Sequence, residues 1–435
     1  MPPVVTSGPL VTTGGATTST HQEEGVTTTP VRRKAANLRG RAALLGPAFV
    51  AAIAYVDPGN VATNTAAGAR YGYLLVWVLV AANVVAGLVQ YLSAKLGLVS
   101  GRSLPEAVRD RLPKPARLAY WGQAEIVAMA TDLAEVLGGA IALNILFGLP
   151  LLWGGLITGV VSTVLLFVQD RRGQKPFERL ITTFLVVIAC GFAAGLLVSP
   201  PTAEVFGGLV PRFDGTDSVL LAAGMLGATV MPHAVYLHSA LARDRHGHVT
   251  GSAVRRVLAA TRADVVMAML LAGAVNLALL LVAASALRGS ENIDEVSGVH
   301  AAIGSTLGGG IAFLFAIGLL ASGLASTAVG NYSGAVVLDG LLHVRVPLML
   351  RRVVTLVPAL ALLASGFDPT DALVLSQVVL SMGIPFALVP LVRLTSSVAT
   401  MGDHVNRRAT TACAWIAVVA IIALNLTLVA LVVTG

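Results

Sequence analysis

Apolar stretches of about 20 residues, the length a helix needs to cross the hydrocarbon core of a bilayer, recur along the whole chain. Short polar connections separate them. Eleven such windows occur, at residues 42–68, 72–98, 119–146, 150–169, 177–198, 217–240, 261–287, 310–340, 351–366, 371–394 and 409–434. The pattern predicts an all-α polytopic membrane protein with eleven transmembrane helices.

The composition agrees with a chain that lies mostly in lipid. Hydrophobic residues make up 56% of it and charged residues 12%, with a mean hydropathy of +0.82, whereas about a quarter of the residues are charged in a soluble domain. The 45 glycines suit the close helix packing of membrane proteins. Cys190 and Cys413 both lie in apolar runs, so we expect buried packing roles for them and neither a disulfide framework nor a thiolate metal site.

Basic residues are distributed unevenly between the two sides of the predicted membrane. The N-terminal tail and the connections after even-numbered windows hold most of them, whereas the opposite connections hold only Arg70, Arg212 and Arg288. Because cytoplasmic connections are enriched in Lys and Arg, we predict a cytoplasmic N-terminus and an extracellular C-terminus. The net charge of +7 then reflects membrane topology, and no nucleic-acid partner is expected.

Residues 1–41 differ from the rest of the chain. They are rich in Thr, Gly and Pro and lack the basic start and apolar core of a signal peptide. We expect them to form a disordered cytoplasmic tail. After this tail, no part of the sequence predicts a soluble domain.

Two of the apolar windows are interrupted by a similar polar motif. The first contains AYVDPGN at residues 54–60 and the sixth contains ATVMPHA at residues 228–234, and both read Ala-x-Val-x-Pro. Broken helices at corresponding places in oppositely oriented halves are typical of inverted-repeat secondary transporters. We therefore predict a 5+5 inverted repeat with discontinuous helices 1 and 6. Residues 42–198 form the first repeat, 199–394 the second, and 395–435 a loop with an additional helix 11.

The prolines in these breaks predict which backbone groups are available to bind an ion. Proline has no N–H, so Pro58 leaves the carbonyl of Ala54 without its helical partner, and Pro232 does the same to Ala228. An unpaired carbonyl in hydrocarbon costs several kcal/mol unless it faces a cavity, a partner or an ion. If the two breaks meet, both carbonyls therefore face a shared polar site.

Three side chains at the breaks complete a candidate cation site: Asp57, Asn60 and Met231. A carboxylate within the membrane is costly and by default functional, although a proline is also compatible with a simple kink and a methionine with packing. A thioether gains little from Mg²⁺ or Ca²⁺, but it favours transition metals such as Mn²⁺, Fe²⁺ or Cd²⁺. These residues alone do not rank Mn²⁺ against Fe²⁺.

Further ionisable residues lie in the third and sixth windows. Asp132 and Glu135 are spaced i,i+3 and share one helical face, Glu125 lies nearer the cytoplasmic entrance, and His233 and His238 follow the second break. Such residues form proton relays or act as hydrogen-bond partners in the core. We expect a functional role for the two acids on one face and a structural one for His238.

At these residues the chain resembles the natural resistance-associated macrophage protein (Nramp) family of proton-coupled divalent-metal transporters, and its bacterial manganese-transporting branch in particular. The resemblance covers about residues 42–434. It rests on four motifs: DPGN at 57–60, MPHA at 231–234, ATDLAEVLGGAIAL at 130–143 and SQVVLSMGIPFALVP at 376–390. It implies the leucine-transporter-type fold and a location in the cell membrane.

The resemblance also implies roles for individual residues. The metal site of the family corresponds to Asp57, Asn60, Met231 and the Ala228 carbonyl in this sequence. In some conformational states Ala54 and Gln377 join these ligands. Its proton pathway corresponds to Asp57, His233, Glu135 and Asp132, with Arg351 and Arg352 near the cytoplasmic exit; topology alone also explains that arginine pair as inside-facing anchors. One departure is Ala234, where many relatives have Asn.

We therefore expect a secondary active transporter that imports divalent transition metals, Mn²⁺ first and also Fe²⁺ and Cd²⁺, by alternating access. Metal arriving at Asp57 would displace its proton towards the cytoplasm through His233 and the acids of the third window. The expected partners are the metal, protons and the lipid bilayer. The chain is expected to function as a monomer and to hold no permanent cofactor.

Three alternatives were weighed: a carrier of organic solutes, an intramembrane enzyme and a passive channel. A sodium-coupled organic-solute carrier would bind a substrate carboxylate at the helix breaks, and competition by Cd²⁺ would distinguish it from a metal transporter. An intramembrane enzyme is less well supported, because the sequence has neither an HExxH zinc motif nor a GxSxG nucleophile elbow. A passive channel does not call for inverted helix breaks.

Overall fold

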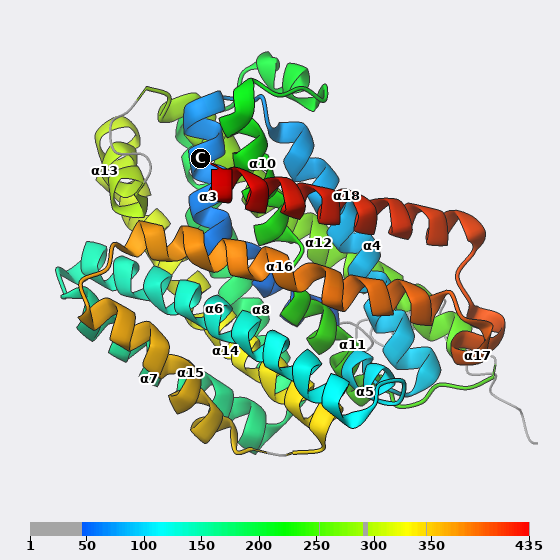
Figure 1. Cartoon of the computed structure of the whole chain (residues 1–435). Coiled ribbons are helices and arrows are strands. Elements are labelled where there is room, and N and C mark those ends of the chain that lie inside the picture. Colours follow the sequence, from blue (N-terminus) through cyan, green and yellow to red (C-terminus); the bar gives the residue numbers. More distant parts are fainter. Residues whose placement is uncertain (1–45, 252, 290–294, 345, 435) are drawn as a thin grey trace, which may run out of the picture. The chain divides into compact units, whose positions relative to one another are not determined.

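The computed structural model describes residues 46–251, 253–289, 295–344 and 346–434 (Figure 1). Within these ranges the secondary structure is helical and contains no strand. The described residues belong to one compact unit. The tail predicted for residues 1–41 lies outside them, so its disorder stays a prediction.

A helix coincides with each of the eleven apolar windows. In chain order these are α2 (Pro47–Ile53) with η1 (Ala54–Val56) and α3 (Pro58–Tyr71); α4 (Val76–Ser100); α6 (Lys114–Phe147); α7 (Leu151–Arg172); α8 (Gln174–Ala193) with α9 (Gly195–Val198); α10 (Gly215–Thr229) with α11 (Pro232–His246); α12 (Ala253–Ala286); α14 (Gly309–Leu342); α15 (Leu348–Ala364); α16 (Pro369–Thr395); and α18 (Arg408–Thr434). The connections contain shorter helices, namely α5 (Leu104–Arg109), η2 (Ala203–Leu209), α13 (Val296–Leu307), α17 (Val398–Met401) and η3 (Gly402–His404).

Eight helices in the described part of the chain are long and apolar enough to cross a membrane. The segment Pro47–Val56 and the first part of α7, Leu151–Phe167, are shorter apolar helices, and α15 has 17 residues. A helix of about 20 residues spans the hydrocarbon core without tilt or thinning of the bilayer. The count of eleven transmembrane helices therefore stays a prediction, although all eleven windows are helical.

Both predicted helix breaks are present. Asp57 is extended (φ −81°, ψ 169°) between η1 and α3, and Met231 is extended (φ −85°, ψ 124°) between α10 and α11. Each precedes a proline at the first position of the next helix. A residue before proline avoids helical geometry, while proline itself suits a helix start. Discontinuous helices 1 and 6 are thus confirmed, with a local cause.

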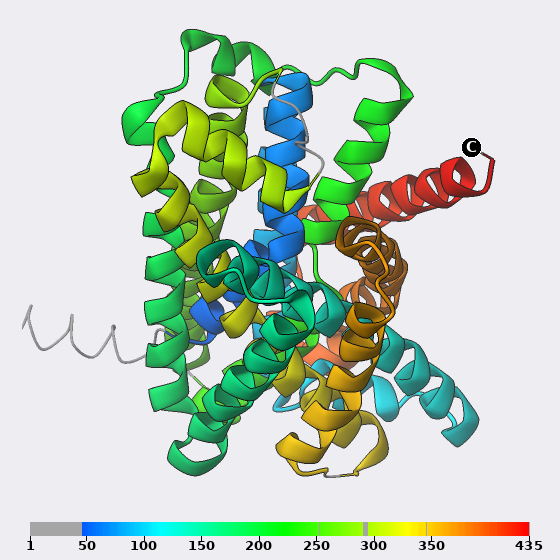
Figure 2. The ribbon, with the colours of Figure 1, turned by 90° about the vertical axis from the view of Figure 1, so that its left-hand side faces the viewer.

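The two broken helices lie together among the longer ones. Figure 1 shows α3 beside α10, and α2 packs against α11. The helices α6 and α14 pack along each other, α12 lies against α2, α3 and α4, and α16 lies against α6, α10 and α11. Figure 2 gives the view at right angles, in which α3 and α10 are again close. Four long helices therefore contribute side chains around the breaks.

One glycine allows the third predicted span to approach the first break. A Cβ atom at Gly138 of α6 would overlap the ring of Pro58 at the start of α3. Gly138 lies three residues after Glu135 and hence on the same helical face. The face of α6 that carries Glu135 is therefore the face that contacts the break.

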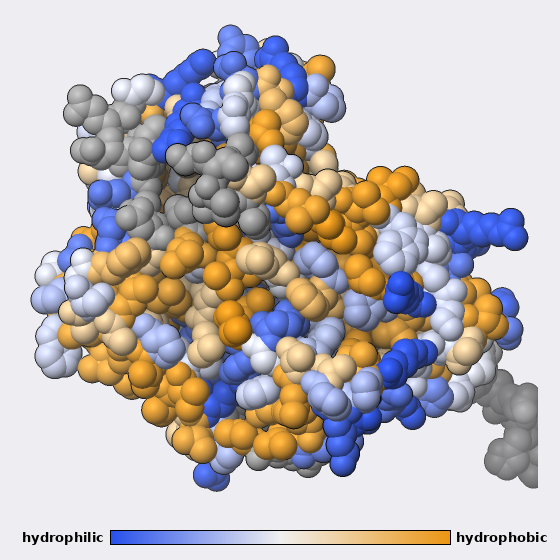
Figure 3. Space-filling model, in the orientation of Figure 1, coloured by the Kyte–Doolittle hydropathy of each residue, from blue (hydrophilic) through white to orange (hydrophobic). Residues whose placement is uncertain are grey.

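Apolar side chains cover much of the molecular surface. Figure 3 shows them gathered over α15, α16 and α18, while hydrophilic residues gather at the top of the view and near α5 and α17. Exposed examples are Val353, Val357, Phe386, Ile416 and Val419. Apolar patches of this extent mark a surface that water does not cover, as expected for helices facing lipid.

The cysteine prediction is wrong in one respect. Cys190 and Cys413 are free thiols, but both are exposed on the outer faces of α8 and α18 and do not fill the core. In a membrane protein an apolar run does not identify a buried position, because lipid replaces water on the outer face of each helix.

Candidate metal-binding site

The two helix breaks are joined by one side-chain amide. Asn60 Nδ2 donates hydrogen bonds to Asp57 Oδ1 (2.7 Å) and to the carbonyl oxygen of Ala228 (2.8 Å). The backbone N–H of Asn60 also donates to Asp57 Oδ1 (2.8 Å). Oxygen acceptors from both broken helices therefore converge on a single atom, which is the arrangement that a cation requires of its ligands.

These residues are shielded from solvent. Asp57, Asn60, Ala228 and Met231 each have no exposed surface, and Met231 is the extended residue of the second break. Asp57 Oδ2 has no hydrogen-bond partner among the described residues. A buried carboxylate oxygen without a partner is costly in this environment. The second oxygen of Asp57 is thus available to a proton or a metal ion.

Gln377 of α16 lies on the same side of α3 as the Asp57 carboxylate. A Cβ at Gly59 would meet the amide carbon of Gln377 at 2.8 Å and Asp57 Oδ2 at 3.1 Å. The amide nitrogen and oxygen of Gln377 are buried without partners in the described part of the chain. Ala54 begins η1 one turn before Asp57 and is fully buried.

Three polar residues around the breaks were missed by the sequence analysis. Asn276 of α12 donates to the carbonyl of Tyr55 (2.7 Å), and Ser322 of α14 donates to the carbonyl of Val56 (2.5 Å). The Thr229 hydroxyl donates mainly to the carbonyl of Met225 (2.6 Å) and lies 3.4 Å from Asn60 Oδ1. Backbone groups freed by a break inside a membrane need such partners. An isolated Asn within an apolar helix was the available signal for Asn276.

The two acids of α6 differ in their surroundings. Asp132 forms an ion pair with Arg352 of α15, which also donates to Ser162 of α7 at 3.0 Å. Both oxygens of Glu135 are buried and have no hydrogen-bond partner among the described residues. Asp132 is therefore held as a compensated charge, whereas the Glu135 carboxylate lies against Gly330 of α14 without a partner in the described part of the chain.

Both predicted exit arginines are buried and paired. Arg351 Nη1 donates to the two oxygens of Glu125 at 2.8 and 2.9 Å, and the side chains of Arg351 and Arg352 are 5% and 1% exposed. An anchor at the membrane surface would extend its guanidinium into water. The structure therefore favours a role inside the helix bundle over the anchor interpretation.

The two histidines of α11 have different environments. Neither ring nitrogen of His233 has a partner among the described residues, and its side chain borders a cavity of about 10 Å³ between α6, α11 and α14. His238 Nδ1 is hydrogen-bonded to Gln90 Oε1 (2.7 Å), and Gln90 is bonded to the Tyr55 hydroxyl. A structural role for His238 agrees with these contacts, whereas His233 borders a small and mostly apolar cavity.

The described residues contain no group of three or more His, Cys, Asp or Glu side chains that could hold a metal ion. The candidate site instead combines one carboxylate with an amide, a carbonyl and a thioether. A site with one charged ligand holds a metal less tightly than a site of several anionic ligands. Such a donor set suits transient binding of a transported ion.

Comparison with known proteins assigns a family to this arrangement. The family described as natural resistance-associated macrophage protein-like matches residues 48–431. The chain is 65% identical over 394 residues to the divalent metal cation transporter MntH of Mycobacterium tuberculosis (strain ATCC 25618 / H37Rv), covering 90% of this chain and 92% of the relative.

Solved structures with the same fold are also known. A manganese transporter of Eremococcus coleocola, in complex with an aromatic bis-isothiourea compound, superposes with a TM-score of 0.83 at 32% identity, covering 90% of this chain and 86% of that one. The nucleobase-cation-symport-1 transporter MHP1 in a closed conformation gives 0.59 at 19% identity over 88% and 89% of the chains, a likeness of fold alone. These matches confirm the predicted leucine-transporter-type fold.

Proposed function

Because this chain belongs to the Nramp family of membrane metal transporters, we propose that it imports divalent transition-metal ions, Mn²⁺ first, by alternating access coupled to proton movement. The family consists of transporters rather than enzymes. The observation that carries the proposal is the Asn60 amide, which bonds both the Asp57 carboxylate and the Ala228 carbonyl.

The proposed metal ligands are Asp57, Asn60, Met231 and the Ala228 carbonyl, with Ala54 and Gln377 joining during the transport cycle. Asp57 supplies the negative charge that compensates a divalent cation in the low-dielectric interior. The thioether of Met231 gives the site a preference for transition metals over Mg²⁺ and Ca²⁺. Two relatives described as a divalent metal cation transporter and a manganese transporter support this choice of substrate.

The proposed proton pathway starts at Asp57 and includes His233, Glu135 and Asp132, with Arg351 and Arg352 near the cytoplasmic exit. A metal ion that binds Asp57 displaces the proton of that carboxyl, since both compete for the same oxygen. Glu135 is well situated to receive it, because its unpartnered carboxylate lies on the face of α6 that contacts Pro58. Proton relays in membrane transporters use such intramembrane acids.

The same proposal includes the orientation and assembly of the protein. The uneven distribution of basic residues supports a multi-pass protein of the cell membrane with its N-terminus in the cytoplasm and its C-terminus outside. The metal and the protons pass through a single chain, so the transporter acts as a monomer and needs no permanent cofactor.

Uptake by proteoliposomes tests the proposal as a whole. We expect Mn²⁺ uptake that rises when the external solution is made more acidic than the lumen, and that Cd²⁺ and Fe²⁺ inhibit while Mg²⁺ and Ca²⁺ do not. Protein-free liposomes are the control. Uptake no faster than in those liposomes would refute metal transport. Uptake that ignores the pH gradient would refute only the proton coupling.

Replacing Met231 by Ala is expected to reduce selectivity more than activity. Without the thioether, the preference for Mn²⁺ over Ca²⁺ should fall by about tenfold, which corresponds to about 1.4 kcal/mol. Competition of each ion against radioactive Mn²⁺ measures the change. Met382→Ala is the matched control, since the Met382 side chain of α16 is 53% exposed, whereas Met231 is fully buried. An unchanged ranking of ions in Met231→Ala would contradict the selective role of the sulfur.

A further inference from the structure

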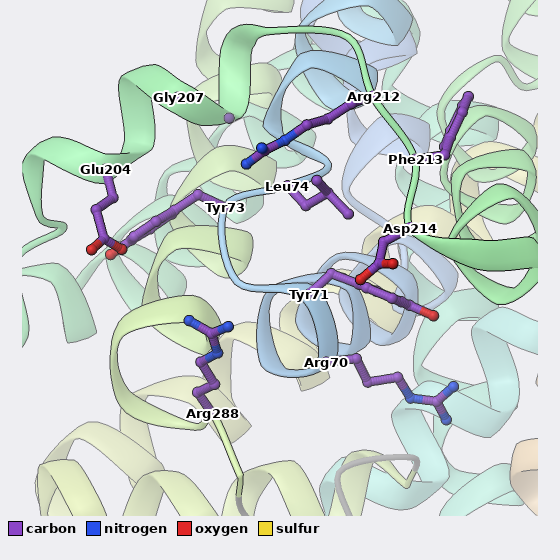
Figure 4. A pocket seen from close by; sticks show the side chains of 11 residues that line it. Arg70, Tyr71, Tyr73, Leu74, Glu204, Gly207, Arg212, Phe213, Asp214 and Arg288 are labelled. Atoms are coloured by element: carbon purple, nitrogen blue, oxygen red, sulfur yellow. The ribbon is translucent and has the colours of Figure 1, made fainter.

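All three arginines of the predicted extracellular connections meet in one pocket. Arg70 lies in the last turn of α3, Arg212 precedes α10, and Arg288 follows α12. They are far apart in sequence, yet they line the same pocket of about 680 Å³ (Figure 4). The convergence cannot follow from local sequence and is a property of the fold.

This gathering of positive charge opposes two general tendencies. The extracellular side of a membrane protein is depleted in basic residues, and like charges in one pocket repel one another. Arginines that serve only solubility would be expected apart from each other rather than around one cavity.

The pocket offers hydrogen-bond donors on one side. Figure 4 shows the guanidinium groups of Arg212 and Arg288 directed into the space near Tyr73, while Asp214 lies beside Tyr71 on the other side. Within the described ranges, neither of these two guanidinium groups has an ion pair or a hydrogen bond. Two acids, Asp214 and Glu204, are also part of the lining, which keeps a net positive charge.

The walls of the pocket are fixed by contacts outside it. Trp77 Nε1 donates to the carbonyl of Arg212 (3.2 Å), and the Trp77 ring meets Phe213 edge-on at 5.3 Å. The backbone N–H of Thr202 donates to the Tyr73 hydroxyl at 3.2 Å. The segments that carry Arg212 and Tyr73 are thus held in place without a ligand. Fixed backbone segments reduce the entropy that is lost when a ligand binds.

We propose that this pocket binds a small oxyanion, a carboxylate or a phosphate group, at the extracellular end of the protein. The planar guanidinium fork matches both groups with paired hydrogen bonds, and the volume is that of a small-molecule site. The oxyanion belongs either to a free anion such as citrate or to the headgroup of a lipid in the outer leaflet. The inference does not depend on the identity of the transported metal.

Titration of the full-length protein in detergent and in nanodiscs tests the pocket. In dodecyl maltoside, which has no phosphate group, citrate and inorganic phosphate are expected to bind saturably and to raise the unfolding temperature. Binding should weaken by about tenfold or more in the Arg212→Gln/Arg288→Gln double variant, because each loses a charged hydrogen-bond donor. Arg393→Gln is the matched control; it removes one exposed arginine of α16 that does not line this pocket and should leave binding unchanged.

A second measurement tests whether the bound oxyanion is a lipid headgroup. If headgroups occupy the pocket, phosphatidylglycerol in the discs will weaken citrate binding to the native protein but not the residual binding of the double variant. Arg288→Lys keeps the positive charge but loses the planar guanidinium group, so it should bind citrate with intermediate affinity. This variant replaces the double variant in the test if the double variant does not fold. Absence of saturable binding by the native protein would overturn the proposal, and so would binding by the Arg212→Gln/Arg288→Gln and Arg288→Lys variants that equals that of the native protein.

Discussion

Asp57→Asn is expected to reduce Mn²⁺ uptake by about 100-fold or more, since loss of groups that only support metal ligands already costs 10- to 100-fold in affinity or activity. The substitution removes the negative charge that compensates the metal ion in a buried site. It also removes the carboxyl that exchanges a proton for the metal. Metal uptake and metal-stimulated acidification of the liposome lumen should therefore disappear together.

The substitution is chosen so that folding is preserved. Asp57 is the N-cap of α3 and accepts the backbone N–H of Asn60, and Asn caps a helix about as well as Asp. Asp403→Asn, at an exposed position of η3, is the matched control and should transport normally. Metal uptake or acidification by Asp57→Asn at the native rate would rule out the proposed site, provided the variant is purified with the native unfolding temperature.

The centre of this site was accessible from sequence because its causes are local. A proline removes one N–H and constrains the residue before it, so Pro58 and Pro232 predict both the breaks and the carbonyl of Ala228 that becomes available. The similar motifs in the first and sixth windows then predicted that the breaks belong to matching halves. The hydrogen bond from the Asn60 side-chain amide to the Ala228 carbonyl agrees with the prediction that the two breaks meet.

Contacts between distant segments were not accessible in this way. Arg352 and Asp132 are 220 residues apart, and Asn276 bonds the carbonyl of Tyr55 across 221 residues. No local sequence pattern predicts which polar residue of one helix bonds to the backbone at a break in another helix. Only the resemblance to a family suggested Gln377. The outward positions of the cysteines were missed because hydrophobicity alone does not separate lipid-facing from core positions.

Arg352→Met is expected to destabilise the protein by about 3–5 kcal/mol, the usual cost of removing one partner of a buried ion pair. The Asp132 carboxylate would remain buried without its counter-ion, and Ser162 would lose the donor that now bonds it at 3.0 Å. The free energy of unfolding in detergent, followed by denaturant titration, measures the loss. Arg393→Met, an exposed arginine on α16, should change it by less than about 0.5 kcal/mol.

The double variant Asp132→Leu/Arg352→Met separates stability from function. Replacing both members of a buried pair with apolar residues is often neutral or stabilising, so most of the lost stability should return. If the pair lies on the proton pathway, this stable variant will still take up Mn²⁺ but will no longer respond to an imposed pH gradient. If the double variant has native stability and a native response to the pH gradient, the role of the pair is structural only. The proton would then reach the cytoplasm from Glu135 by another route.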